Sequence, residues 1–94
     1  MVDWTDGTLG DLREIEARMR LQSPASARRL VERIFARADL LLKHLRLGPM
    51  VAEFEDEGLR ELFEKPFRFV YRVEADGVKI LTVFHSARDF PRDP

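Results

Sequence analysis

Residues 67–85 read FRFVYRVEADGVKILTVFH, and this stretch decides the fold. Apolar residues alternate with other residues from Phe67 to Val73, and a second apolar run extends from Val78 to His85, which is typical of two β-strands. The Asp76-Gly77 pair between the runs is a strong hairpin signal, because glycine readily adopts the positive φ that a tight turn requires. The stretch therefore predicts an antiparallel β-hairpin.

The register of this hairpin decides which side chains share a face. With the turn at residues 76 and 77, residue 75 lies opposite 78, so that the expected pairs are Glu74 with Lys79, Val70 with Val83 and Arg68 with His85. One face is then expected to carry Phe67, Phe69, Tyr71, Val73, Ile80 and Phe84. The other face is expected to carry Arg68, Val70, Arg72, Leu81, Val83 and His85. A shift of one residue would break these pairs.

Two helices are predicted before the hairpin. Apolar residues recur at helical spacing over residues 7–21, and a wide apolar stripe runs through residues 24–45. Ser23-Pro24 starts the second helix, with serine as N-cap and proline at the first helical position. About two residues separate the helices, so they are expected to fold back as an antiparallel pair.

These elements predict an α+β fold, with an N-terminal helical hairpin packed on a small, mostly antiparallel sheet. We expect one domain over residues 1–94, because chains of this length rarely divide into two. Residues 1–5 are a candidate edge strand, whereas residues 59–63 fit either a helical turn or a strand.

The composition narrows the function classes. There is no cysteine, and two histidines, His44 and His85, are too few for a zinc site without carboxylates, so neither a metal nor a cofactor is expected. The net charge is −1, and an excess of basic residues is absent, so direct nucleic-acid binding by this chain is not expected. No apolar run approaches 20 residues and no basic leader precedes one, which predicts a cytoplasmic protein without membrane contact.

Several motifs resemble one protein family. The helical half has Trp4-Thr5, a Leu9-x-x-Leu12-x-x-Ile15 series and Ser23-Pro24. The second half follows the pattern REL … PYRIVYRV … VxILxVxHxxRD through Arg60-Glu61-Leu62, Pro66–Val73 and Val78–Phe90. Over residues 4–90 the chain resembles the ParE branch of the RelE/ParE toxin superfamily. It departs from that family at Arg18, where many members have an aromatic residue, and at His44-Leu45, where Phe-Pro is frequent.

The resemblance implies a RelE-like fold, a bacterial source, a role in plasmid stabilisation and a ParD-like antitoxin as partner. For ParE members it implies inhibition of DNA gyrase, whereas the RelE branch cleaves messenger RNA on the ribosome. Fold alone does not choose between these activities. Three hypotheses follow: a toxin that binds gyrase, a ribosome-dependent endoribonuclease, and a toxin that has lost activity and only binds its antitoxin.

The candidate catalytic residues for a ribonuclease are Arg68, His85 and Arg88, which could hold a phosphate and exchange a proton. The interpretation we favour is structural, with Arg68 and Arg72 solvated or paired to Glu61 or Asp89. Tyr71 alternates with apolar neighbours, which favours a core tyrosine over a catalytic hydroxyl. The acidic residues between 53 and 57 favour a solvated loop over a metal site.

Two binding surfaces are predicted. An apolar patch rimmed by arginine is expected to be exposed and to bind the antitoxin, through Arg68, Val70, Arg72, Leu81 and Val83. The alternative is that residues 50–63 of the chain itself cover this patch. Just past the last strand, a second surface is expected to bind the target, through Arg88, Asp89 and Phe90.

Overall fold

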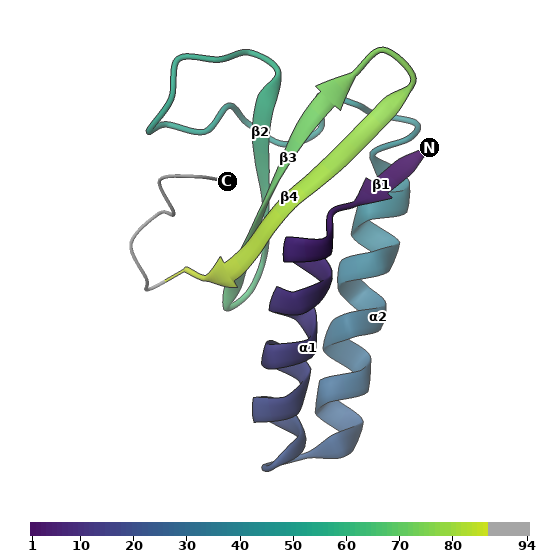
Figure 1. The fold of residues 1–94 in the computed structure, drawn as a ribbon, viewed down its shortest axis with the longest axis vertical. Helices are drawn as coiled ribbons and strands as arrows, with labels where there is room; N and C mark the ends of the chain where they lie inside the picture. Colours follow the sequence, from purple (N-terminus) through teal and green to yellow (C-terminus); the bar gives the residue numbers. More distant parts are fainter. Residues whose placement is uncertain (87–94) are drawn as a thin grey trace.

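The computed structural model describes residues 1–86, in which two helices pack on a four-stranded sheet (Figure 1). The elements are β1 (Val2–Trp4), α1 (Asp6–Arg20), α2 (Pro24–Leu40), β2 (Leu59–Glu64), β3 (Phe67–Glu74) and β4 (Gly77–His85). The strand order is β1-β4-β3-β2, with β1 parallel to β4 and the other pairs antiparallel. The predicted α+β class is confirmed, and residues 59–63 belong to a strand.

Polar caps start both helices. The Thr5 hydroxyl accepts a hydrogen bond from the Thr8 backbone N–H at 3.1 Å, and the Ser23 hydroxyl does the same for Ser26 at 3.2 Å. Thr8 is fully buried, and its hydroxyl donates to the Ile80 carbonyl at 2.8 Å. The first turn of α1 is therefore tied directly to β4.

The second helix is shorter than the prediction of residues 24–45. It ends at Leu40, and residues 41–47 continue as successive turns in which Leu42 donates to the Asp39 carbonyl and Leu47 to that of His44. Its apolar stripe does continue into this segment, because Leu41 is fully buried. The periodicity therefore reports burial beyond the point where the regular helix stops.

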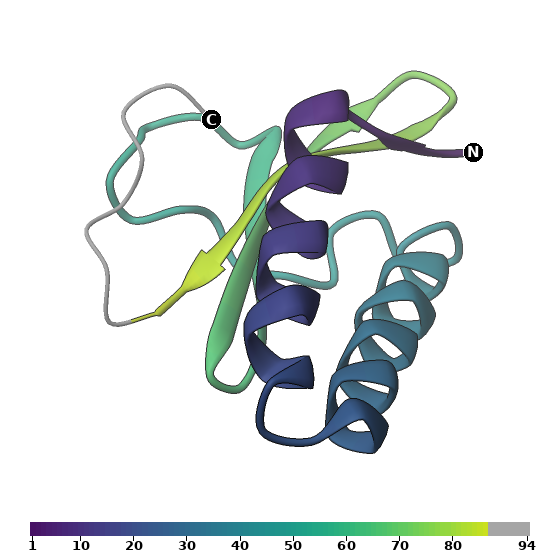
Figure 2. The same cartoon turned by 60° about the horizontal axis from the view of Figure 1, so that its bottom comes forward.

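The main core lies between the helices and one face of the sheet (Figure 2). Both helices lie on the same side of the sheet. The connection from α2 to β2 begins on that side with Leu41 and Leu45, and its later part, from Val51 on, lies on the other side. The helices contribute Leu12, Ile15, Leu30, Ile34 and Ala38 to this core, and the strands contribute Leu62, Phe67, Phe69, Tyr71, Val78, Ile80 and Val83. No helix within residues 1–86 is long and apolar enough to cross a membrane.

A second, smaller cluster occupies the opposite face. Val51 from the connection packs with Leu59, Val70 and Phe84, and Phe54 lies against them. Val51, Val70 and Phe84 are each at most 2% exposed. The connection between α2 and β2 therefore serves as a cover for the face that the helices leave open.

The predicted register of the hairpin is wrong. The two-residue turn is Ala75-Asp76, so that Glu74 pairs with Gly77 and not with Lys79. Gly77 has φ +152°, and a Cβ there would lie 2.0 Å from the Met1 carbonyl oxygen, so the glycine is required beside β1 and not inside the turn.

A β-bulge changes the faces along β4. Tyr71 pairs with Ile80, whereas Val70 pairs with Thr82, so Leu81 is the extra residue. Beyond it the alternation is reversed, which moves Val83 to the helix side of the sheet and Phe84 to the opposite side. The predicted positions of these two side chains are therefore exchanged.

Candidate functional site

Arg68 is the centre of the most elaborate polar cluster on the sheet. Its side chain is 12% exposed and forms a short ion pair with Glu61 on the neighbouring strand β2, and a second one at 3.5 Å with Glu53 of the connection. The guanidinium carbon lies 5.5 Å from the Phe63 ring centre and 5.3 Å from that of Phe84. Arg68 thus fixes the connection to the sheet, and the predicted pairing with Glu61 is confirmed.

The protonation of Arg68 follows from these contacts. Burial alone would lower the pKa of its guanidinium, but the hydrogen bonds to Glu61 and Glu53 raise that pKa above its ordinary value. The residue therefore stays charged, and its charge is already shared between two carboxylates. A phosphate would have to displace one of them.

Arg72 lies four residues further along β3 and is also paired with a carboxylate of the connection. Its guanidinium donates to the Asp56 carboxylate at 2.9 Å, and the Gly58 N–H donates to the same carboxylate at 2.9 Å. Arg72 and then Gly58 lower the pKa of the Asp56 carboxyl below its ordinary value. Two members of the acidic run therefore pair with the two arginines of β3, which the interpretation as a solvated loop missed. The signal in the sequence is the opposite charge of the two segments, because residues 50–58 contain four acidic residues and no basic one, and β3 carries two arginines.

The predicted ribonuclease residues do not share one face. His85 pairs with Phe67 in the register, and the two rings meet edge to face with centres 5.6 Å apart. Arg68 pairs instead with Phe84 on the opposite side of the sheet. The bulge at Leu81 is the reason, because it shifts the register by one residue between the turn and His85. The third candidate, Arg88, lies outside the described residues.

Tyr71 is a core residue, as the sequence favoured. It is fully buried, and its hydroxyl oxygen accepts a hydrogen bond from the Gly48 N–H at 3.0 Å. Burial raises the pKa of Tyr71, while the hydrogen bond from Gly48 and the nearby charges of Arg60 and Arg46 act in the opposite direction. This hydroxyl holds the chain where it crosses from the helices to the sheet.

The exposed antitoxin-binding patch predicted from the sequence is not present. Val70 is 0% exposed beneath the connection, and Val83 is 2% exposed in the core on the helix side. Residues 50–58 cover the face, and the bulge turns Val83 away from it. Arg68, Arg72 and Leu81 remain partly accessible at this surface. The target-binding residues Arg88, Asp89 and Phe90 lie outside the described part of the chain.

The described residues also form a cleft between α1 and the end of β4. It encloses about 140 Å³ and is lined by Asp11, Ile15, Arg18, Met19, Phe67, Val83, Phe84 and His85. At its edge the Asp11 carboxylate accepts hydrogen bonds from the Val83 N–H at 3.2 Å and from the Thr82 hydroxyl at 3.1 Å. Asp11 thereby provides an acceptor for a backbone N–H of β4 that lies beyond the residues with which β1 pairs.

Two helices packed on one side of a mixed four-stranded sheet are an architecture similar to that in two solved structures of toxin–antitoxin systems. A structure of the chromosomal ParDE system from P. aeruginosa is similar to this chain with a TM-score of 0.73 and 25% identity, over 89% of this chain and 92% of the other. The toxin–antitoxin complex RelBE2 from Mycobacterium tuberculosis is similar with a TM-score of 0.60 and 26% identity, over 90% and 95% of the two chains. A comparison with curated proteins gives no match. The chain belongs to the family of ParE toxins of the type II toxin–antitoxin system parDE, which it matches over residues 2–90.

Proposed function

We propose that this chain inhibits DNA gyrase in the bacterial cytoplasm by protein–protein contact and is neutralised by a ParD-like antitoxin. Membership of the ParE family supports the toxin activity. Similarity to the ParDE system and to the RelBE2 complex supports an antitoxin as partner, because both of those structures come from toxin–antitoxin systems.

The observation that carries the choice of a binding toxin is the separation of Arg68 from His85. Cleavage of RNA without a metal requires a base, an acid and cations around one phosphate. In this chain the Arg68 guanidinium is held by Glu61 and Glu53 on one side of the sheet, whereas the His85 ring packs on Phe67 at the other side. This arrangement favours inhibition by binding over catalysis.

The alternative function is a ribosome-dependent endoribonuclease of the RelE type. The similarity to RelBE2, with a TM-score of 0.60, favours it. It would use Arg68, His85 and Arg88, so His85 is the residue on which the two functions differ. His85 is exposed, so its replacement by alanine is expected to remove the ring contact with Phe67 and to leave the protein folded.

The test compares the wild type with H85A. Both proteins are assayed for inhibition of supercoiling by purified gyrase and for cleavage of messenger RNA on translating ribosomes. We expect equal inhibition of supercoiling by both proteins and intact transcripts. Codon-phased cuts that disappear in H85A, together with normal supercoiling, would establish the ribonuclease instead. Inactivity of both proteins in both assays would indicate a toxin that has lost its activity.

A further inference from the structure

Exposed apolar side chains are concentrated where α2 gives way to the connection, in the segment Leu40–Met50, called here the 40–50 segment. Within residues 1–86, eight large apolar side chains are exposed, and four of them belong to this segment. They are Leu40, Leu42, Leu47 and Met50, and each of these residues is 41–46% exposed. Single exposed apolar residues are ordinary, but four of them within eleven residues make this segment a candidate interaction surface.

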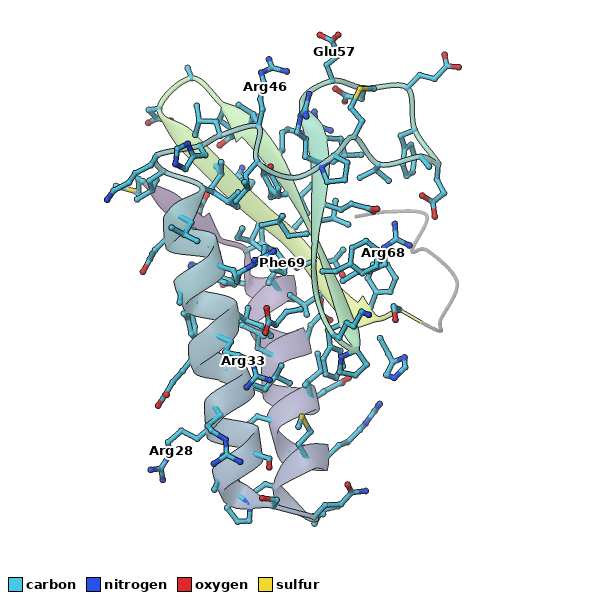
Figure 3. The ribbon with its side chains drawn as sticks, turned by 180° about the vertical axis from the view of Figure 1, so that it is seen from behind. Arg28, Arg33, Arg46, Glu57, Arg68 and Phe69 are labelled. Carbon is cyan, nitrogen blue, oxygen red and sulfur yellow. The ribbon has the colours of Figure 1, made fainter. Side chains whose placement is uncertain are left out.

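The same segment carries uncompensated positive charge. Lys43, His44 and Arg46 are exposed, and the segment contains no acidic residue. Neither Lys43 nor Arg46 has an ion pair with any residue of the described chain, whereas the arginines of β3 are paired. His44, Arg46 and Leu47 together line a shallow depression of about 530 Å³. In Figure 3, Arg46 points away from the protein at the end remote from the turn between the helices.

The 40–50 segment is held in place at several points. The Gly48 N–H donates to the Tyr71 hydroxyl at 3.0 Å, and Arg60 donates to the Gly48 carbonyl at 3.1 Å. The Glu61 N–H donates to the Pro49 carbonyl at 3.1 Å, and Leu41 is fully buried at the other end. A surface that is ordered before binding loses less conformational entropy when a partner arrives.

We propose that the 40–50 segment is a docking site for an acidic, amphipathic segment of the antitoxin. The apolar side chains of the antitoxin segment lie on Leu42 and Leu47, and the carboxylates of the antitoxin segment pair with Lys43 and Arg46. This proposal rests on the proposed function, because it takes the partner to be the antitoxin that neutralises the chain. The antitoxin is favoured over the target because a lasting complex covers apolar surface more completely than a transient contact does.

The test uses charge reversal at this surface with a matched control. The K43E/R46E variant and the R28E/R29E variant change the net charge equally, and Arg28 lies at the far end of α2 (Figure 3). Each protein is purified and titrated with the cognate ParD-type antitoxin by calorimetry, at low and at high salt, after circular dichroism has shown that it is folded. L47S is measured as an uncharged second variant.

K43E/R46E is expected to weaken antitoxin binding by about tenfold or more and to reduce its dependence on salt, because both cations face carboxylates. L47S is expected to weaken binding by a similar factor through faster dissociation, and R28E/R29E is expected to stay within about threefold of the wild type. Equal weakening by both charge variants would overturn the proposal, as would unchanged binding by K43E/R46E and L47S. Loss of gyrase inhibition with unchanged antitoxin binding would assign the surface to the target. Failure of the wild type to bind any antitoxin would refute the proposed function itself.

Discussion

Replacement of Tyr71 by phenylalanine tests whether its hydroxyl is structural. The ring is fully buried, and the hydroxyl accepts the hydrogen bond of the Gly48 N–H at 3.0 Å. In Y71F the ring still fills its site, but the buried Gly48 N–H loses its acceptor. An unsatisfied buried donor costs about 1–3 kcal/mol. We expect the free energy of unfolding to fall by this amount. The loss is substantial, because the free energy of unfolding of a small domain is only about 5–15 kcal/mol.

The loss is measured by urea denaturation and by the melting temperature, which falls by about 4–8 °C for each kcal/mol in a domain of about this size. Tyr71 is the only tyrosine in the chain, so the ultraviolet absorbance of tyrosinate reports its ionisation alone. Titration is expected to give a pKa above the ordinary value of 10.0, because burial disfavours the phenolate.

The direction of the pKa shift also fixes the effect of pH on stability. A folded-state pKa above the unfolded value means that the contribution of Tyr71 is complete below pH 10.0 and is lost as pH rises through the folded pKa. Y71F lacks this loss, so the difference in stability between the two proteins should shrink in alkaline solution. Equal stability of both proteins at neutral pH, or a tyrosine that titrates at 10.0 or below, would refute the structural role.

Three further experiments test the fold and the proposed target contact. V83E is expected to lower the free energy of unfolding in urea by about 3–5 kcal/mol or to prevent folding, because it places an unpaired charge in the core; unchanged stability would contradict the bulge that turns Val83 inward. G77A is expected to lower the free energy of unfolding in urea by more than about 1 kcal/mol, since its Cβ meets the Met1 carbonyl, whereas G10A in the open face of α1 should raise it by about 0.5–1 kcal/mol. Truncation after Ser86 is expected to abolish growth inhibition and to leave antitoxin binding measurable; full toxicity of the soluble truncated protein would exclude a target contact beyond that residue.

The periodicity of the sequence was sufficient for the helices and for the existence of the hairpin. Ser23-Pro24 marks the start of α2 because capping is a local property, and the alternation from Phe67 to Val73 marks β3 because one face is buried. The turn was placed one residue too late, because Gly77 is required by the approach of Met1, which comes from the other end of the chain. The bulge at Leu81 has no local signal, since every residue around it is equally suited to a strand.

The same bulge explains the errors at the candidate site. One inserted residue separates Arg68 from His85 and moves Val83 of the predicted antitoxin patch into the core. Val70 of the same patch is buried for a different reason, because residues 50–58 cover it. The pairing of Arg68 with Glu61 was predictable, because the charges are close in sequence and on adjacent strands. The contribution of Glu53 was not, since it depends on how residues 50–58 fold over the sheet.

The pairing of β1 with β4 sets the order in which the chain can fold during its synthesis. Val2 pairs with Val78, so β1 leaves the ribosome well before the strand that it pairs with. Translation of the residues between these two takes on the order of 4–15 s at about 5–20 residues per second, and contacts of such long range form slowly. The helical hairpin can form early, since its two halves are neighbours in sequence, but its apolar face has no sheet to cover until β4 emerges. Completion of the sheet and of the main core is therefore expected only after β4 has emerged from the ribosome.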